Sequence, residues 1–311
     1  MIKKIKIENN YISNNSECFI IAEAGVNHNG DLNNAILLAD LAKEAGANAV
    51  KFQLYDAKEQ VSKYAESAPY QRKGTGKKTM FSMSKLYDLP WENHRKISEH
   101  CRNIGIAYMS SCFDKNAVDF LIDDLKSDCI KIGSGEITNY PLLSYIAKKN
   151  VSIILSTGMC SLDDVKGSIN HIRKYGNPPI IILHCVSNYP ANEIHLNLKA
   201  MITLEKEFKC LIGYSDHSEG EIASTIAVAL GAKIIEKHFT IDKNLPGPDH
   251  AMSLNPTQLK FFIDNIRLTE KILGTGIKEP TSGELKMIKY ARRSIVSLKN
   301  INKGDMIEKD N

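Results

Sequence analysis

Three ionisable residues stand in a row inside an apolar, strand-like run of the sequence. The run is IIEKHFT, residues 234–240, and it contains Glu236, Lys237 and His238. Burying such groups costs free energy unless they are paired, ligated or face a cavity. Because side chains alternate along a strand, Glu236 and His238 share one face and Lys237 points the other way. We expect the first two to face a site, and Lys237 to have a structural role in an ion pair outside it.

Two histidines at the ends of consecutive strand-like runs indicate a divalent metal site. His217 ends GYSDH, His238 follows in the next run, and each has a polar same-face residue two positions earlier, Ser215 and Glu236. Neutral imidazoles from adjacent strands can take two positions of a metal ion and leave the others for water and substrate. Mn²⁺, Zn²⁺ or Co²⁺ would suit these donors, and Glu236 could then accept hydrogen bonds from a ligated water or a substrate hydroxyl. The alternatives are hydrogen-bonded core histidines, and a salt bridge from Glu236 to an inner lysine.

Two lysines within strand-like runs indicate a site for an anion. Lys51 and Lys131 lie where an unpaired ammonium would be unfavourable. They either pair with Glu23 or Glu136, or neutralise a bound carboxylate or phosphate with the help of nearby hydroxyls and amides. The polar side chains expected at the same strand ends are Gln53, Ser134, Ser156 and Ser215.

Short β-branched runs alternate eight times with helical patterns, and these elements must position the polar residues. The predicted strands are 18–25, 48–55, 106–113, 129–135, 151–158, 179–187, 210–217 and 233–240. This alternation predicts a closed (β/α)8 TIM barrel, with an open doubly wound sheet as the alternative. In a barrel, catalytic groups lie at the carboxyl ends of the strands, where this chain concentrates its polar residues.

The segments outside the repeat predict four parts of the chain. We expect an N-terminal extension over 1–17, the catalytic barrel over 18–275, a linker over 276–293 and a further small domain that begins at 294–311. The last segment reads as a β-hairpin with an Asn/Lys/Gly turn. Residues 56–90 interrupt the second unit, and their polar, basic, glycine-containing sequence predicts a mobile loop over the site.

Composition narrows the class of protein. The 311 residues are 43% hydrophobic and 24% charged, which is typical of a globular chain, and the formal charge of +4 is dispersed. Nothing therefore favours nucleic acid or a membrane surface as partner. Seven scattered cysteines without zinc spacing predict free thiols in a reducing cytoplasm, and no signal peptide or membrane-length apolar run is present.

Taken together, these residues resemble the sialic acid synthase family, the nonulosonic acid synthases. The resemblance spans nearly the whole chain through the motifs IAEAGVNHNGDL, KFQ, KIGSGEITNYP, LSTGM, GYSDHSEG, ALGAKIIEKHFTIDK and GPDHAMSL. It implies an enzyme that condenses phosphoenolpyruvate with an N-acetylated hexose aldehyde and water, giving a nine-carbon acid and phosphate. It also implies a barrel followed by a small antifreeze-like (SAF) domain, in a homodimer where that domain covers the partner's site.

The resemblance assigns roles to individual residues. His217 and His238 match ligands of Mn²⁺. The positions that match phosphoenolpyruvate contacts are Lys51, Gln53, Lys131, Ser134, Ser156 and Ser215. The positions that match the acceptor sugar and the reacting carbons are Glu23, Tyr189 and Glu236. A carboxylate, Glu23 or Glu236, is expected to orient or deprotonate the attacking water.

Departures from the family pattern bear on the acceptor sugar. Ser187 stands where bacterial N-acetylneuraminate synthases tend to have asparagine, while EAGVNHNG, GYSDH and FTIDKNLPGPDH resemble the legionaminate synthase branch. The expected acceptor is 2,4-diacetamido-2,4,6-trideoxymannose, giving N,N'-diacetyllegionaminate, with N-acetylmannosamine as the alternative. The sequence ends at Asn311 without the arginine that the family's antifreeze-like domain uses to hold the sugar, so we expect weaker acceptor binding than in a longer form.

Two other classes of function fit parts of the pattern. A barrel aldolase could form a Schiff base through a strand lysine such as Lys131. A barrel that binds sugar without catalysis is the other possibility. Two measurements distinguish these alternatives from the synthase: the metal content of the protein after replacement of His217 and His238, and the release of phosphate from phosphoenolpyruvate.

Overall fold

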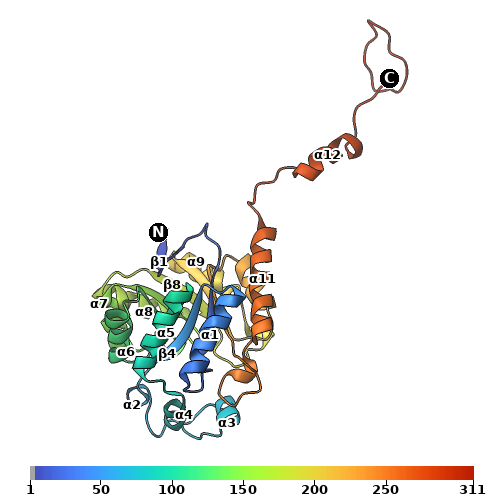
Figure 1. The fold of residues 1–311 in the computed structure, drawn as a ribbon. Coiled ribbons are helices and arrows are strands. Elements are labelled where there is room, and N and C mark those ends of the chain that lie inside the picture. Colours follow the sequence, from blue (N-terminus) through green and yellow to red (C-terminus); the bar gives the residue numbers. More distant parts are fainter. Residues whose placement is uncertain (1–3) are drawn as a thin grey trace. The chain divides into compact units, whose positions relative to one another are not determined.

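A closed barrel of eight parallel strands forms the centre of the protein. The computed structural model describes residues 4–311, and the barrel is drawn in Figure 1. Its strands follow in chain order, β10 closing on β3: β3 Phe19–Gly25, β4 Ala49–Leu54, β5 Ala107–Cys112, β6 Cys129–Ile132, β7 Ser152–Ser156, β8 Ile180–Cys185, β9 Leu211–Asp216 and β10 Ile234–His238. The predicted (β/α)8 barrel is confirmed, and the open sheet is excluded because β10 pairs with β3.

Helices cover the outside of the barrel and bury the outward face of each strand. They are α1 Leu32–Ala45, α5 Trp91–Ile104, α6 Lys115–Asp119 with the π-helical turn Phe120–Asp124, α7 Tyr140–Lys149, α8 Leu162–Tyr175, α9 Ala200–Phe208, α10 Ile222–Ala229 and α11 Pro256–Leu273. Local sequence sets their ends. Asp31 caps α1, which ends at Gly46 with φ 93°, and Ser161 begins α8 in a capping box. Strands covered in this way are almost wholly apolar on their outer side.

A short hairpin closes the N-terminal end of the barrel. Strands β1 Ile5–Ile7 and β2 Asn10–Ile12 pair antiparallel. Their isoleucines Ile5, Ile7 and Ile12 are buried in one cluster with inward-facing apolar residues of the barrel, including Phe19 and Met109. The N-terminal end is thus filled with apolar side chains, which leaves the carboxyl end for polar chemistry.

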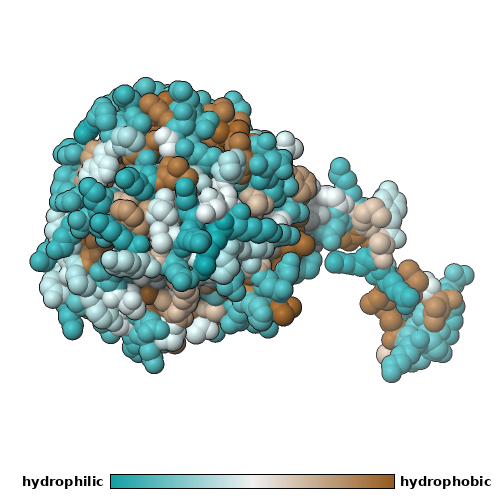
Figure 2. Space-filling model, turned by 90° about the horizontal axis from the view of Figure 1, so that it is seen from below, coloured by the Kyte–Doolittle hydropathy of each residue, from teal (hydrophilic) through white to brown (hydrophobic). Residues whose placement is uncertain are grey.

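The insert between β4 and α5 covers the opposite end of the barrel (Figure 1). It folds as three short helices, α2 Ala57–Gln60, α3 Pro69–Thr75 and α4 Met80–Tyr87, so the prediction of a loop was wrong about its structure. Its backbone contacts the loop after β10 closely, since a Cβ added at Gly74 would lie 2.2 Å from the Gly247 carbonyl oxygen. The Tyr70 ring also stacks on Tyr189, with 5.2 Å between centroids. Figure 2, which views this side, shows a mostly hydrophilic surface with scattered hydrophobic side chains.

Residues 273–311 form a second compact unit, separate from residues 1–272. This unit contains α12 Ser282–Ala291, which begins with a capping box at Thr281. No strand forms within 294–311, so the predicted hairpin was wrong. Most of its apolar side chains, among them Ile295 and Val296, are exposed, and a two-stranded hairpin without a packing partner is marginally stable.

None of the helices within residues 4–311 combines the length and hydrophobicity that a membrane span requires.

A buried histidine in the helix layer predicts sensitivity of the fold to acid. His94 of α5 is 1% exposed, its Nδ1 lies 2.9 Å from the Tyr108 hydroxyl, and burial lowers its pKa to about 3. A folded-state pKa below the unfolded value gives stability that is fully present above pH 6.5 and is lost as the pH falls toward 3. We expect the free energy of unfolding to fall by about 2 kcal/mol through this group between pH 7.5 and 5. In urea titrations at both pH values, His94→Gln should lose correspondingly less; an equal loss in both proteins would contradict the assignment.

Candidate active site

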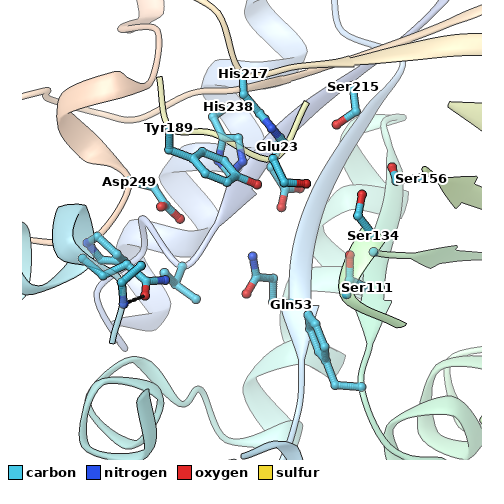
Figure 3. A pocket seen from close by; sticks show the side chains of 18 of the residues that line it. Glu23, Gln53, Ser111, Ser134, Ser156, Tyr189, Ser215, His217, His238 and Asp249 are labelled. Carbon is cyan, nitrogen blue, oxygen red and sulfur yellow. Dashed lines mark hydrogen bonds between the residues drawn. The ribbon is translucent and has the colours of Figure 1, made fainter. Parts of the chain in front are cut away.

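A pocket of about 610 Å³ opens at the carboxyl ends of the barrel strands. Every side chain that the sequence predicted for the site lines it: Glu23, Lys51, Gln53, Lys131, Ser134, Ser156, Ser187, Tyr189, Ser215, His217, Glu236 and His238. Figure 3 shows Tyr189 and both histidines grouped on one side and four serines on the other, with Glu23 between them and Gln53 below. Strand alternation brings the strand residues together, and Ser134, Ser187, Tyr189 and His217 join them from the segments that follow the strand ends. Their roles stay predictions.

Two lysines and two glutamates form a buried ionic cluster in this pocket. Lys51 Nζ lies 2.7 Å from Glu23 Oε2 and 3.7 Å from Glu236 Oε2, and Lys131 Nζ lies 3.5 Å from Glu236 Oε1. The lysines are only 2% and 3% exposed. The alternative of lysine–glutamate pairing is thus correct for Glu23 and Glu236. Glu136 does not take part, because its Oε2 accepts a hydrogen bond from Asn139 instead.

The cluster sets the charge of its members. Burial alone would raise the pKa of Glu236, but Lys131 and Lys51 outweigh it and hold that pKa below its usual value. Burial raises the pKa of Glu23 against the opposing effect of Lys51. Burial also lowers the pKa of Lys131, with Glu236 opposing. Glu236 faces both lysines and is therefore held in its ionised form.

Hydroxyl groups surround the lysines and include one without a partner. Ser111 Oγ accepts from Lys51 Nζ at 3.1 Å, and Ser134 Oγ accepts from the Gly158 amide at 2.9 Å. Ser156 Oγ is buried and has no hydrogen-bond partner among the described residues. Buried polar atoms are normally satisfied, so this hydroxyl points to a ligand that brings acceptor atoms. Lysines, hydroxyls and an amide together suit a phosphate or carboxylate.

The two histidines lie side by side at the wall of the pocket, with ring centroids 5.6 Å apart. His217 Nδ1 is 2.8 Å from the Val186 carbonyl oxygen, which accepts its proton and leaves Nε2 with a lone pair. Burial lowers the pKa of His238, which keeps it neutral, and its Nδ1 is buried without a partner among the described residues. The residues therefore fit a divalent cation. Residues 4–311 contain no group of three or more His, Cys, Asp or Glu placed to hold a metal, so further ligands would come from water and substrate.

Outside the ionic cluster, aromatic and insert side chains form the mouth of the pocket. The Tyr189 ring lies 4.1 Å from the His217 ring, centroid to centroid. The insert contributes Gln60, Glu66, Ala68, Tyr70, Gln71, Met80, Met83, Ser84 and Tyr87. The mouth is accordingly mixed in character, with apolar walls and hydrogen-bonding groups, as a sugar-sized ligand requires.

Sequence reasoning missed Ser111, Cys185, Asp249 and the insert side chains, all of which line the pocket. Strand alternation could have found Ser111, because it pairs in register with Gln53 on the neighbouring strand. Cys185 is the last residue of β8, so strand alternation could have found it as well. Its Sγ lies 3.7 Å from His217 Nδ1. Asp249 lies beyond the strand in a loop, where burial raises its pKa to about 6, and no periodic signal marks it.

Comparison with known proteins gives consistent relationships. Residues 38–278 match the NeuB family. An N,N'-diacetyllegionaminic acid synthase of Legionella pneumophila is 47% identical over 298 residues, covering 94% of this chain and 83% of the relative. The human N-acetylneuraminate-9-phosphate synthase is 35% identical over 301 residues, covering 96% and 83%.

A solved structure agrees with this fold. The N-acetylneuraminic acid (sialic acid) synthetase of Leptospira borgpetersenii, in complex with citrate, superimposes with a TM-score of 0.82 at 35% identity, covering 94% of this chain and 98% of that one. The resemblance found in the motifs is thereby confirmed over most of the sequence. The chain belongs to the NeuB family.

Proposed function

We propose that this protein condenses phosphoenolpyruvate with the open-chain aldehyde of an N-acetylated hexose and with water, releasing phosphate and a nonulosonic acid. The proposed product is N,N'-diacetyllegionaminate, which the 47% identity to a synthase of that name supports. The observation that carries the proposal is the pocket itself, in which the buried Lys51 and Lys131 and the histidine pair at the ends of β9 and β10 line one cavity. Condensation needs both an anion site and a site for the aldehyde within one cavity.

The lysines and hydroxyls would hold phosphoenolpyruvate at the floor of the pocket. Lys51 and Lys131 offset the negative charge of the phosphate and carboxylate, and Ser134 and Ser156 donate hydrogen bonds to their oxygens. These groups are held by strands and an ion-pair network, so they are oriented before the substrate arrives. The vinyl carbon of the substrate is thereby held toward the histidine side of the cavity.

His217 Nε2 and the His238 ring would hold a divalent cation, which we propose to be Mn²⁺. When bound, such an ion supplies Lewis acidity that polarises a carbonyl oxygen. C3 of phosphoenolpyruvate then forms a bond to the aldehyde carbon, and the aldehyde oxygen takes up a proton. Water adds to C2, and the C2–O bond to phosphate breaks, leaving the 2-oxo acid.

A carboxyl group of the ionic cluster would position the water. Glu23 is nearly fully buried, contacts Lys51 at 2.7 Å and pairs in register with His238 on the adjacent strand. These contacts with Lys51 and the neighbouring His238 support the proposal that Glu23 positions the water near the two reacting carbons. Glu236, bound by both lysines and by the Ser215 hydroxyl at 2.9 Å, keeps those lysines oriented.

Side chains of the insert and Tyr189 would contact the acceptor sugar, and Ser187 would lie beside the hydroxyl groups that hold phosphoenolpyruvate. We propose 2,4-diacetamido-2,4,6-trideoxymannose as acceptor. N-acetylmannosamine is the second candidate, and the structural similarity to the Leptospira sialic acid synthetase favours it.

A phosphate-release assay with Mn²⁺ and phosphoenolpyruvate tests the function and the acceptor together. The acceptors are the 2,4-diacetamido sugar, its altrose-configured analogue and N-acetylmannosamine. We expect kcat/KM for the first to exceed that for the others by at least about 10-fold, a difference of about 1.4 kcal/mol in transition-state binding. Equal kcat/KM values for the three acceptors would contradict the legionaminate assignment. Borohydride trapping of pyruvate on Lys131 without phosphate release would favour an aldolase.

We further propose that the protein acts in the cytoplasm as a homodimer, and that residues 294–311 begin an antifreeze-like (SAF) domain. All seven cysteines are free thiols, which supports a reducing compartment. Sedimentation equilibrium tests the dimer.

A further inference from the structure

A second buried ionic cluster lies directly behind the two histidines, on the outer side of the barrel wall. Lys237 Nζ is 3.0 Å from Asp216 Oδ2, and the two residues are 2% and 1% exposed. They face each other in register, because β10 and β9 pair Lys237 with Asp216. Each is the immediate chain neighbour of one histidine, His238 and His217.

The Asp216 carboxylate also fixes the backbone around His217. Its Oδ1 accepts from the Ser218 amide at 2.8 Å and from the Ser218 hydroxyl at 2.6 Å, which closes an Asx turn with His217 at its centre. Its Oδ2 accepts from the Ser224 hydroxyl of α10 at 2.7 Å. The strand end is thereby tied to the helix layer.

Lys237 completes the connection from the neighbouring strand. Besides contacting Asp216, its Nζ donates to the Ser218 carbonyl oxygen, so it binds the residues on both sides of His217. The ammonium also lies 5.9 Å from the ring centroid of Phe262 in α11. Lys237, the chain neighbour of His238, therefore holds the peptide segment that carries His217 through these two contacts.

We propose that Lys237 and Asp216 are positioning residues, which set the spacing of His217 and His238 for the divalent cation of the proposed function. A buried ion pair is weak evidence for stability, because apolar replacements of similar volume often stabilise as well. Its best supported use is to fix register. Here the pair fixes the register of β9 and β10 at the strand ends that carry His217 and His238.

The test measures Mn²⁺ affinity by equilibrium dialysis or by the electron paramagnetic resonance of free Mn²⁺. The double variant Asp216→Asn/Lys237→Met removes both charges, while the side-chain oxygen of the introduced asparagine can still accept from the Ser218 amide. The Asx turn is therefore kept, and the losses are the ion pair, the Lys237 contact with the Ser218 carbonyl and the Ser224 contact with Oδ2. We expect the Kd for Mn²⁺ to rise about 10- to 100-fold, as when partners of metal ligands are removed. The KM for phosphoenolpyruvate should change less than the Kd for Mn²⁺, because Lys51, Lys131 and Ser156 lie on β4, β6 and β7, away from the replaced pair.

Arg267→Met is the matched control. Arg267 pairs with Glu270 at 2.7 Å in the helix layer, and it contacts Cys18 and Asn48 at the N-terminal ends of strands. This variant also removes a charged side chain that links the helix layer to the strands, and it should leave Mn²⁺ affinity unchanged. The single variant Asp216→Asn is the second measurement in case the double variant does not fold, because it keeps the Ser218 carbonyl oxygen as an acceptor for Lys237.

Two outcomes would overturn the proposal, and they differ. If the double variant folds and binds Mn²⁺ within about twofold of the unmodified protein, the pair is merely structural and the metal site stands. If the unmodified protein binds no Mn²⁺ and His217→Ala changes nothing, both the metal site and its support are wrong.

Discussion

Replacing His238 by alanine is expected to lower the rate of phosphate release on the order of 10³-fold at a fixed Mn²⁺ concentration, because Lewis-acid activation contributes several kcal/mol. The rings of His238 and His217 lie side by side in the pocket, with their centroids 5.6 Å apart, and their nitrogens are the proposed metal ligands. Loss of one ligand should also weaken Mn²⁺ binding in dialysis. The fold should survive, since the removed ring lies at a pocket wall.

His171→Ala is the control for this prediction. His171 lies on α8, stacks on Tyr140 at 4.6 Å and does not line the pocket. Its replacement should change neither Mn²⁺ binding nor turnover. If His238→Ala retained full metal content and rate, a hydrogen-bonded core histidine would be the correct interpretation and the metal site would be refuted.

Replacing Gly158 by alanine should raise the KM for phosphoenolpyruvate about 10- to 100-fold, as overpacking by one methyl costs about 1–3 kcal/mol. A Cβ at this position would lie 2.2 Å from Ser187 Oγ, 2.9 Å from Ser134 Oγ and 3.3 Å from Cys185 Sγ. The methyl group must therefore displace the Ser187 hydroxyl and push on the Ser134 hydroxyl, which is one of those that would hold the anion. Initial-rate kinetics with phosphoenolpyruvate as the varied substrate measure the effect.

Gly135→Ala is a close control, because Gly135 lines the same pocket and a Cβ there meets nothing within 4 Å. Its KM should stay near that of the unmodified protein. A similar increase of the KM for phosphoenolpyruvate in both variants would contradict this explanation. It would show that a general distortion of the loop, and not the displaced hydroxyl groups, causes the effect.

Much of the fold and of the pocket could be predicted because strand alternation is strictly periodic. The runs around Lys51 and His238 become strands of the barrel, and residues two apart along them face the same cavity. Lys237 pairs outside the barrel with Asp216, as the alternation predicts. Closure of a parallel barrel then collects the strand ends at one place.

The remaining features depend on contacts that periodicity does not encode. The insert forms helices because Thr79 caps α4 and because its backbone meets Gly247, which is distant in sequence. Asp249 reaches the pocket from a loop. The segment 294–311 has an Asn/Lys/Gly sequence that suits a turn, but a two-stranded hairpin is marginally stable by its turn chemistry alone, and no strand forms there.

The isoleucine-filled N-terminal end of the barrel has a consequence for the order of events in catalysis. Because Ile5, Ile7 and Ile12 fill that end, substrates and products share the mouth beneath the insert. In the proposed reaction the anion would bind at the buried Lys51 and Lys131, below the insert side chains, so we expect phosphoenolpyruvate to enter before the sugar. We then expect phosphate to be the last product to leave. Inorganic phosphate should accordingly compete with phosphoenolpyruvate and not with the sugar.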